Sequence, residues 1–198
     1  MVTDRGQAHT LEASVAALLL LVSIGIALQM TAVTPLSAST SSQHLENQLE
    51  ESAKGVLASS AESGDLKTAL LYWNSNASKF HNADTEYYYT NNKSEHSLGQ
   101  TLNRTLDQRN VAYNVYVVFE TSDNEQRRRR MIYSGEPSEH AVTASHTVTL
   151  LSNDNLIDAD GTTNSTTIGE TSAYYIPNST GTPGVYNHVR VEVVAWRI

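Results

Sequence analysis

An uninterrupted apolar stretch near the N-terminus constrains this chain more than any other feature. Residues Ala13–Met30 contain no charged residue and no proline, and Gly25 is the one glycine among them. A helix over this range is about 27 Å long, close to the roughly 30 Å thickness of a bilayer's hydrocarbon core. Because lipid offers the backbone no hydrogen-bond partners, a helix that satisfies its own peptide groups is favoured over a strand. The sequence therefore predicts a membrane-spanning helix.

Three kinds of membrane helix remain open: a secretory signal peptide, a plain signal anchor, and a prepilin-type leader that is cut on its short polar side. The secretory interpretation is the weakest, because such peptides have an apolar core of about 7 to 15 residues followed by a small-residue cleavage site. Here the apolar run is longer, and residues 36–38 offer only a poor cleavage site. In addition, Glu12 stands where neutral or basic residues are expected.

A short motif, Arg5-Gly6-Gln7, precedes the apolar stretch, and Glu12 follows it closely. This pattern resembles the class III signal peptide of archaeal type IV pilins and pilin-like proteins, in particular the haloarchaeal ones. The resemblance implies that a prepilin peptidase cuts between Gly6 and Gln7, and that the apolar helix is retained and assembles with other pilin-like subunits. In that family the acid is usually the fifth mature residue, whereas Glu12 would be the sixth.

The chemistry of Glu12 leaves two roles open. A charged side chain costs roughly 2.5 to 3.5 kcal/mol at the centre of a spanning helix and less near the membrane surface. After cleavage, the new ammonium group of Gln7 and the positive end of the helix dipole would be partners for this carboxylate. Glu12 could then pair with Gln7 of a neighbouring subunit and fix the register of the two helices. Alternatively, it lies among lipid headgroups without a further role.

The rest of the chain has the composition of one acidic domain. About 160 residues follow the apolar helix, which is the usual size of a single domain. The net charge is −8, four residues are lysine, and there is no cysteine. This balance resembles halophilic proteins and argues against nucleic acid as a partner. The lack of cysteine excludes disulfides and thiolate metal sites.

The distribution of positive charge predicts the orientation in the membrane. Arg5 precedes the helix, and no lysine or arginine follows it before Lys54. The positive-inside rule therefore predicts a single-pass protein of the cell membrane, with a cytoplasmic N-terminus and an extracellular C-terminal domain. Five N-x-Ser/Thr sequons are candidate N-glycosylation sites on that surface: Asn76, Asn92, Asn103, Asn164 and Asn178.

Four segments are expected along the chain. They are a prepilin-type leader at 1–6, a transmembrane and assembly helix at 7–33, an amphipathic helix at 34–64, and an extracellular α+β domain at 65–198. In the third segment, one apolar stripe with helical spacing would pack on the domain. The stripe consists of Leu45, Leu49, Ala53, Val56 and Leu57.

Within the last segment, the hydrophobic period changes from helical to strand-like. Short helices are predicted at 65–73 and 97–108, and a long half-buried strand is predicted at 111–119, where apolar residues alternate. Further strands are expected at 130–134, 141–151, 171–176 and 188–198. Helices followed by strands indicate an α+β fold with an antiparallel sheet. Pilin-like proteins share this plan, as do many unrelated domains.

Two charged clusters have competing interpretations. Asp154, Asp158 and Asp160 lie before Gly161, but their spacing does not fit a calcium-binding EF-hand loop, so a solvated acidic loop is favoured. The run Arg127–Arg130 could bind an acidic glycan, DNA or an acidic neighbouring subunit. A solvated hairpin end, neutralised by nearby acidic residues, is the favoured interpretation.

No enzymatic motif is present, and no metal site, cofactor or small-molecule substrate is predicted. The seven histidines show no HExxH pattern, and the chain has no GxSxG, GxGxxG or P-loop. We therefore predict a pilin-like, membrane-anchored surface protein that assembles through its N-terminal helix. The main alternative is a signal-anchored extracellular binding domain that does not assemble, and an anchored hydrolase is a more distant one.

Overall fold

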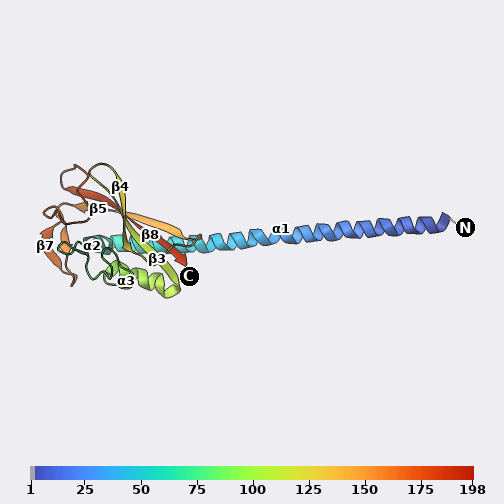
Figure 1. The fold of residues 1–198 in the computed structure, drawn as a ribbon, viewed down its shortest axis with the longest axis horizontal. Coiled ribbons are helices and arrows are strands. Elements are labelled where there is room, and N and C mark those ends of the chain that lie inside the picture. The colour runs from blue at the N-terminus through green and yellow to red at the C-terminus, as the bar shows by residue number, and fades with distance from the viewer. Residues whose placement is uncertain (1–2) are drawn as a thin grey trace. The chain divides into compact units, whose positions relative to one another are not determined.

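The structure, a computed structural model, describes residues 3–198, with the side chains of residues 9–29 and 42–198. The chain forms two compact units, Met1–Leu45 and Glu46–Ile198. Helix α1 spans Thr3–Glu62 and contributes residues to both (Figure 1). The other elements belong to the second unit: α2 Asp65–Leu71, β1 Trp73–Asn74, β2 Lys79–Phe80, α3 Ser97–Thr105, the 3-10 helix η1 Asp107–Arg109, β3 Val111–Glu120, β4 Gln126–Ile132, β5 Val142–Leu151, β6 Asn155–Ile157, β7 Thr163–Thr167 and β8 Val185–Arg197.

The C-terminal part of α1 packs on the second unit through the predicted apolar stripe. Leu49, Ala53, Val56 and Leu57 are buried in the main hydrophobic core, whereas Leu45, which belongs to the first unit, is exposed. Leucine and valine side chains contribute about 1.5 to 3 kcal/mol each when fully buried, so this stripe is a large part of what holds α1 to its domain.

A four-stranded antiparallel sheet, in the order β4-β3-β8-β5, forms the centre of the second unit. Two small hairpins, β1–β2 and β6–β7, flank it. In Figure 1, the β6–β7 hairpin lies at one end of this unit and the C-terminus at the other. The predicted α+β fold with an antiparallel sheet is confirmed.

Strand β3 is buried on both faces, so the prediction of a half-buried strand is wrong. One face, including Tyr113 and Val115, packs in the main core, while Tyr116 belongs to a second cluster on the other face. The connection between β4 and β5 makes hydrogen bonds to a β3 side chain on that second face. There, Ser134 N–H donates to Asn114 Oδ1 at 2.7 Å and Asn114 Nδ2 donates to the Gly135 carbonyl at 2.8 Å.

Several predicted boundaries differ from the observed ones. The segment 171–176 is not a strand but an irregular segment whose Tyr174 and Ile176 side chains are buried, with the Tyr174 hydroxyl donating to the Leu70 carbonyl at 3.0 Å. The predicted helix at 97–108 ends at Thr105 and continues as η1. The predicted helix at 65–73 ends at Leu71, because the next residues form β1.

Candidate functional site

The first candidate site is the apolar part of α1. Residues His9–Gln29 form a helix that contains an 18-residue apolar window with a mean hydropathy of 2.3, and this window is not buried against any described part of the protein. Its two serine side chains are satisfied locally, since the Ser14 hydroxyl donates to the Thr10 carbonyl at 2.8 Å and the Ser23 hydroxyl to the Leu19 carbonyl at 2.5 Å. An exposed helix of this length and composition is what a lipid bilayer accommodates.

The predicted processing and assembly residues lie at the start of this helix. The backbone of Arg5, Gly6 and Gln7 is helical, but their side chains lie outside the described residues, as do residues 1–2 of the predicted leader. The Glu12 side chain is exposed, and its carboxylate lies 3.8 Å from the His9 imidazole. Glu12 is therefore accessible to a partner from another molecule.

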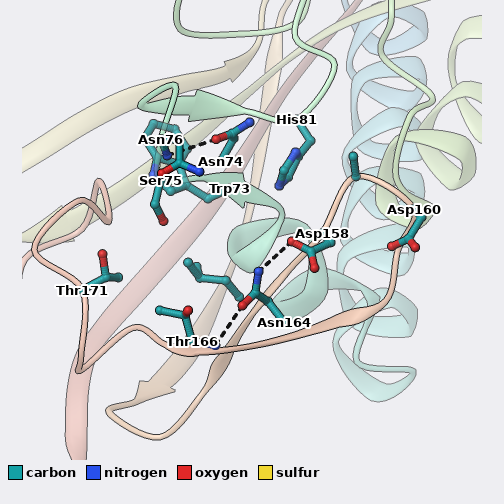
Figure 2. A pocket seen from close by; sticks show the side chains of 12 residues that line it. Trp73, Asn74, Ser75, Asn76, His81, Asp158, Asp160, Asn164, Thr166 and Thr171 are labelled. Carbon is teal, nitrogen blue, oxygen red and sulfur yellow. Dashed lines mark hydrogen bonds between the residues drawn. The ribbon is translucent and has the colours of Figure 1, made fainter.

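The second candidate is a pocket of about 670 Å³ between the β1–β2 and β6–β7 hairpins. Amide, hydroxyl and carboxylate groups line it, as Figure 2 shows. Asn164 Nδ2 donates to Asp158 Oδ1 at 2.7 Å, and Asn164 Oδ1 accepts from the Thr166 N–H at 2.9 Å. Burial lowers the pKa of His81 against the opposing effect of Asp158, which favours a neutral imidazole. This hollow is suited to polar binding.

The predicted sequons differ in how free their amides are. Asn76 and Asn164 both line the pocket of Figure 2, but Asn76 is exposed, whereas the Asn164 amide is held at both ends. Asn103 lies within α3 and donates to Asp107 at 3.2 Å. Asn92 is exposed and donates to the Asn82 carbonyl at 3.4 Å.

The fifth sequon, Asn178, is exposed in the connection that leads to β8. Together with Asn76, it has the most accessible side-chain amide of the five. These two positions are therefore the best placed for a modifying enzyme to reach in the folded protein.

The three aspartates of the predicted acidic loop have separate partners. Asp154 pairs with Lys67 at 2.7 Å, and Asp158 accepts from Asn164. Asp160 accepts from the backbone N–H of Thr162 at 3.0 Å and from its hydroxyl at 2.7 Å. Among the described residues, no group of three or more acidic or histidine side chains converges on one point.

The third candidate is the arginine run, which the structure places differently from the prediction. Arg127–Arg130 lie beyond the hairpin turn itself, although Arg127, Arg128 and Arg130 are exposed, as predicted for a solvated run. They lie in β4, paired with Phe119, Val118, Val117 and Tyr116 of β3. The turn that precedes them is closed by a hydrogen bond from Thr121 N–H to the Glu125 carbonyl at 2.8 Å. As part of a strand, the four side chains point alternately to the two faces of the sheet.

Aromatic rings accompany this run on both faces, and the sequence did not indicate that they would meet the arginines. The Arg128 guanidinium lies 3.4 Å from the centre of the Tyr116 ring, and that of Arg130 lies 4.3 Å from the centre of the Tyr133 ring. Arg129 lies among three further rings. A cavity of about 530 Å³ opens beside the strand. The signal in the sequence was the run itself, because four adjacent charges in a strand need neighbours that stabilise them.

Together, these features define a protein with one N-terminal apolar helix, of the kind that anchors a chain in a membrane or acts as a signal sequence, followed by an α+β domain. The chain belongs to DUF7288, a family of unknown function, whose model matches residues 5–195. No curated protein and no solved structure matches it.

Proposed function

We propose that this chain is a type IV pilin-like surface protein that is processed by a prepilin peptidase after Gly6 and assembles through its N-terminal helix. The observation that carries the proposal is the exposed apolar helix His9–Gln29 directly behind the motif Arg5-Gly6-Gln7. The helix anchors the precursor, the cut leaves it attached to its domain, and the domain faces the cell exterior. The proposal places the protein in or beneath a surface filament, with an adhesive or secretory role for the outer domain.

Small residues in the apolar helix support lateral association. Between lipid-embedded helices there is no hydrophobic driving force, so association depends on close van der Waals packing, which small side chains permit. The segment contains six of them: Ala13, Ala16, Ala17, Ser23, Gly25 and Ala27. In the assembled state, the Glu12 carboxylate pairs with the Gln7 ammonium group of a neighbouring subunit.

The mature N-terminus tests the processing step. When the full chain is expressed with its native peptidase, intact mass analysis is expected to find a protein that starts at Gln7. Gly6→Val should block the cut, because the resemblance implies that the peptidase cuts after a basic residue followed by glycine. Gly25→Ala is the matched control and should be processed normally, since a methyl group there meets no other atom within 4 Å. An intact Met1 in the wild type would contradict the proposal, and so would a start beyond residue 30.

Charge reversal at Glu12 tests assembly. Glu12→Lys is expected to reduce incorporation into filaments by about tenfold or more, because it replaces an attractive pair near the membrane with two like charges. The fraction of protein in sheared filaments and in membranes is measured by immunoblot. Membrane insertion should persist, and Glu51→Lys, an exposed acid of α1 outside the apolar segment, should assemble normally. Normal incorporation of Glu12→Lys would rule out this role.

A second candidate function is a signal-anchored binding domain that does not assemble. The observation in its favour is the arginine and aromatic cavity beside β4, which gives the domain a surface suited to a ligand. Uncleaved wild-type protein that retains ligand binding would favour this alternative.

A further inference from the structure

Positive charge is concentrated on a single strand of an otherwise acidic protein. The chain has 13 lysines and arginines and a net charge of −8, yet four of those cations are consecutive in β4. Strand β4 is the last strand of its sheet, which leaves this row at the edge of the domain. Charged side chains at a sheet edge discourage aggregation, but that purpose does not require aromatic neighbours.

The four arginines differ in how their charge is balanced. Arg128 pairs with Glu192 at 3.0 Å, although Glu192 also pairs with Arg190 at 3.0 Å. Arg127 lies 3.8 Å from Glu125 on an exposed surface, where such pairs contribute little. Arg129 and Arg130 have no carboxylate within 4 Å in the described part of the chain. These two guanidinium groups therefore carry charge that the protein itself does not neutralise.

Arg129 is the most constrained of the four. It is partly buried, and its guanidinium carbon lies 4.9 Å from the centre of the Trp73 ring, 5.3 Å from that of Tyr175 and 5.7 Å from that of Tyr87. Burial lowers its pKa, although a guanidinium stays charged at neutral pH. Within the described residues its five N–H donors make no hydrogen bond, and none of its nitrogens is among the buried atoms without a partner, so these donors are open to an acceptor from outside the protein.

A ligand in the cavity of about 530 Å³ beside β4 would supply a hydrogen-bond acceptor to the guanidinium group of Arg129. Arg127–Arg130 form one wall, and Tyr87, Tyr88, Phe119 and Tyr175 form most of the rest. A ligand that fits must offer an anionic oxygen pair to a guanidinium fork and a flat or weakly polar face to the rings. A sugar ring that carries a carboxylate has both, because its C–H face stacks on aromatic side chains while its carboxylate binds arginine.

We propose that this cavity binds a carboxylate-bearing sugar residue of an acidic saccharide, with Arg129 as the principal contact. Arg129 would receive the carboxylate in a bidentate pair, and Tyr87, whose ring lies 5.7 Å from the Arg129 guanidinium carbon, would stack on the sugar ring. The site lies wholly within the unit Glu46–Ile198, so it requires neither processing at Gly6 nor filament assembly.

Two other kinds of ligand, a nucleic acid and an extended peptide, fit this cavity less well. A nucleic acid binds through an extended basic track, whereas here the arginine row covers one short strand of an acidic protein. A peptide could add a strand to the free edge of β4. However, the C-terminal end of that edge is already occupied, since Tyr89 N–H donates to the Met131 carbonyl and Tyr133 N–H to the Tyr89 carbonyl, both at 2.9 Å. A compact group is favoured over an added strand.

The test measures binding of trigalacturonate to the full-length protein in detergent micelles by calorimetry. The wild type should bind it, neutral maltotriose should not bind, and added salt should weaken the affinity. Arg129→Lys retains the charge but loses the planar fork, so the affinity should fall about tenfold or more. Arg104→Lys, an exposed arginine of α3 outside the cavity, is the matched control and should bind as the wild type does.

A second variant keeps the test decisive if Arg129→Lys unfolds. Tyr87 is half exposed, so Tyr87→Ser should leave the core intact and still weaken trigalacturonate binding several-fold by removing the stacking face. The proposal would be overturned if the wild-type protein does not bind trigalacturonate. It would also be overturned if neither Arg129→Lys nor Tyr87→Ser changes the affinity. Tighter binding of a glutamate-rich peptide or of a DNA oligonucleotide would overturn the assignment to a saccharide. Because Gly6→Val leaves this site untouched, failure of processing and failure of binding are distinguishable.

Discussion

We expect Gly99→Ala to destabilise the outer domain by about 3 kcal/mol, the cost of forcing an extra methyl group into a tightly packed position. Gly99 is buried in the first turn of α3. A β-carbon there would lie 1.8 Å from the carbonyl oxygen of Lys93 and 2.9 Å from its carbonyl carbon. Because both are backbone atoms, the conflict can be relieved only by moving the loop or the helix. Chemical denaturation of the full-length protein measures the change in the free energy of unfolding.

Gly55→Ala is the matched control for this substitution. Gly55 also lies in a helix, α1, but it is exposed and no atom is within 4 Å of the added methyl group. Alanine is favoured over glycine in exposed helices, so Gly55→Ala should stabilise the protein by about 0.5 to 1 kcal/mol. Stabilisation by both variants would mean that helix propensity, and not the contact with Lys93, determines the outcome.

The elements that the sequence predicted correctly are those with a long, regular hydrophobic period. The apolar stripe from Leu49 to Leu57 repeats over several helical turns, and β3, β5 and β8 are long strands in which apolar residues recur. In such segments many residues favour the same structure, so a single exception changes little. For the same reason the α+β class was predictable from the order of helices and strands.

The elements that the sequence missed are short and polar. Strand β7, Thr163–Thr167, is built of threonine, serine and asparagine, and its pairing with β6 depends on contacts that no local pattern reveals. Conversely, the segment 171–176 has the composition of a strand but is held as an irregular segment by side-chain contacts, including the hydrogen bond from Tyr174 to the Leu70 carbonyl. Tertiary contacts outweigh strand propensity in both cases.

The arginine cavity is a candidate site that local sequence patterns could not predict. The run Arg127–Arg130 was evident in the sequence, but its placement at the end of a hairpin was wrong, because adjacent charges usually mark a solvated turn. Its aromatic partners come from distant parts of the chain, with Trp73 in β1 and Tyr175 in the segment before β8. The pairing register of β4 with β3 places the arginines, and the tertiary packing of β1 and of the segment before β8 brings the rings to Arg129.

Acidification from pH 7.5 to 4.5 is expected to lower the stability of the outer domain by about 2 to 3 kcal/mol through His96 alone. His96 is buried at the N-terminus of α3, where its Nδ1 accepts a hydrogen bond from the Gly99 N–H at 3.1 Å. Burial lowers its pKa to about 4. The unfolded chain, with an ordinary histidine pKa near 6.5, takes up a proton in this range and the folded protein does not.

The sign of this effect follows from the lowered pKa. Above pH 6.5 the contribution of His96 is fully present, and it is lost progressively as the pH falls from 6.5 toward 4. The neutral ring must carry its proton on Nε2, which is buried and has no hydrogen-bond partner among the described residues. Burial also lowers the pKa of His81, which adds a further loss in the same direction.

His96→Asn isolates this contribution. Asparagine is a good residue for this capping position and can still accept the Gly99 N–H, but it does not titrate. The free energy of unfolding, measured from urea denaturation at several pH values, should therefore fall less steeply between pH 6.5 and 4.5 in the variant than in the wild type. His188→Asn, which replaces an exposed histidine of β8, serves as the control and should keep the wild-type slope. If the free energy of unfolding falls equally steeply with pH in the wild type and in His96→Asn, the imidazole of His96 is protonated in the folded protein as readily as in the unfolded chain. In that case, the cap of α3 would tolerate a charged ring, and the buried nitrogen would have an acceptor within reach.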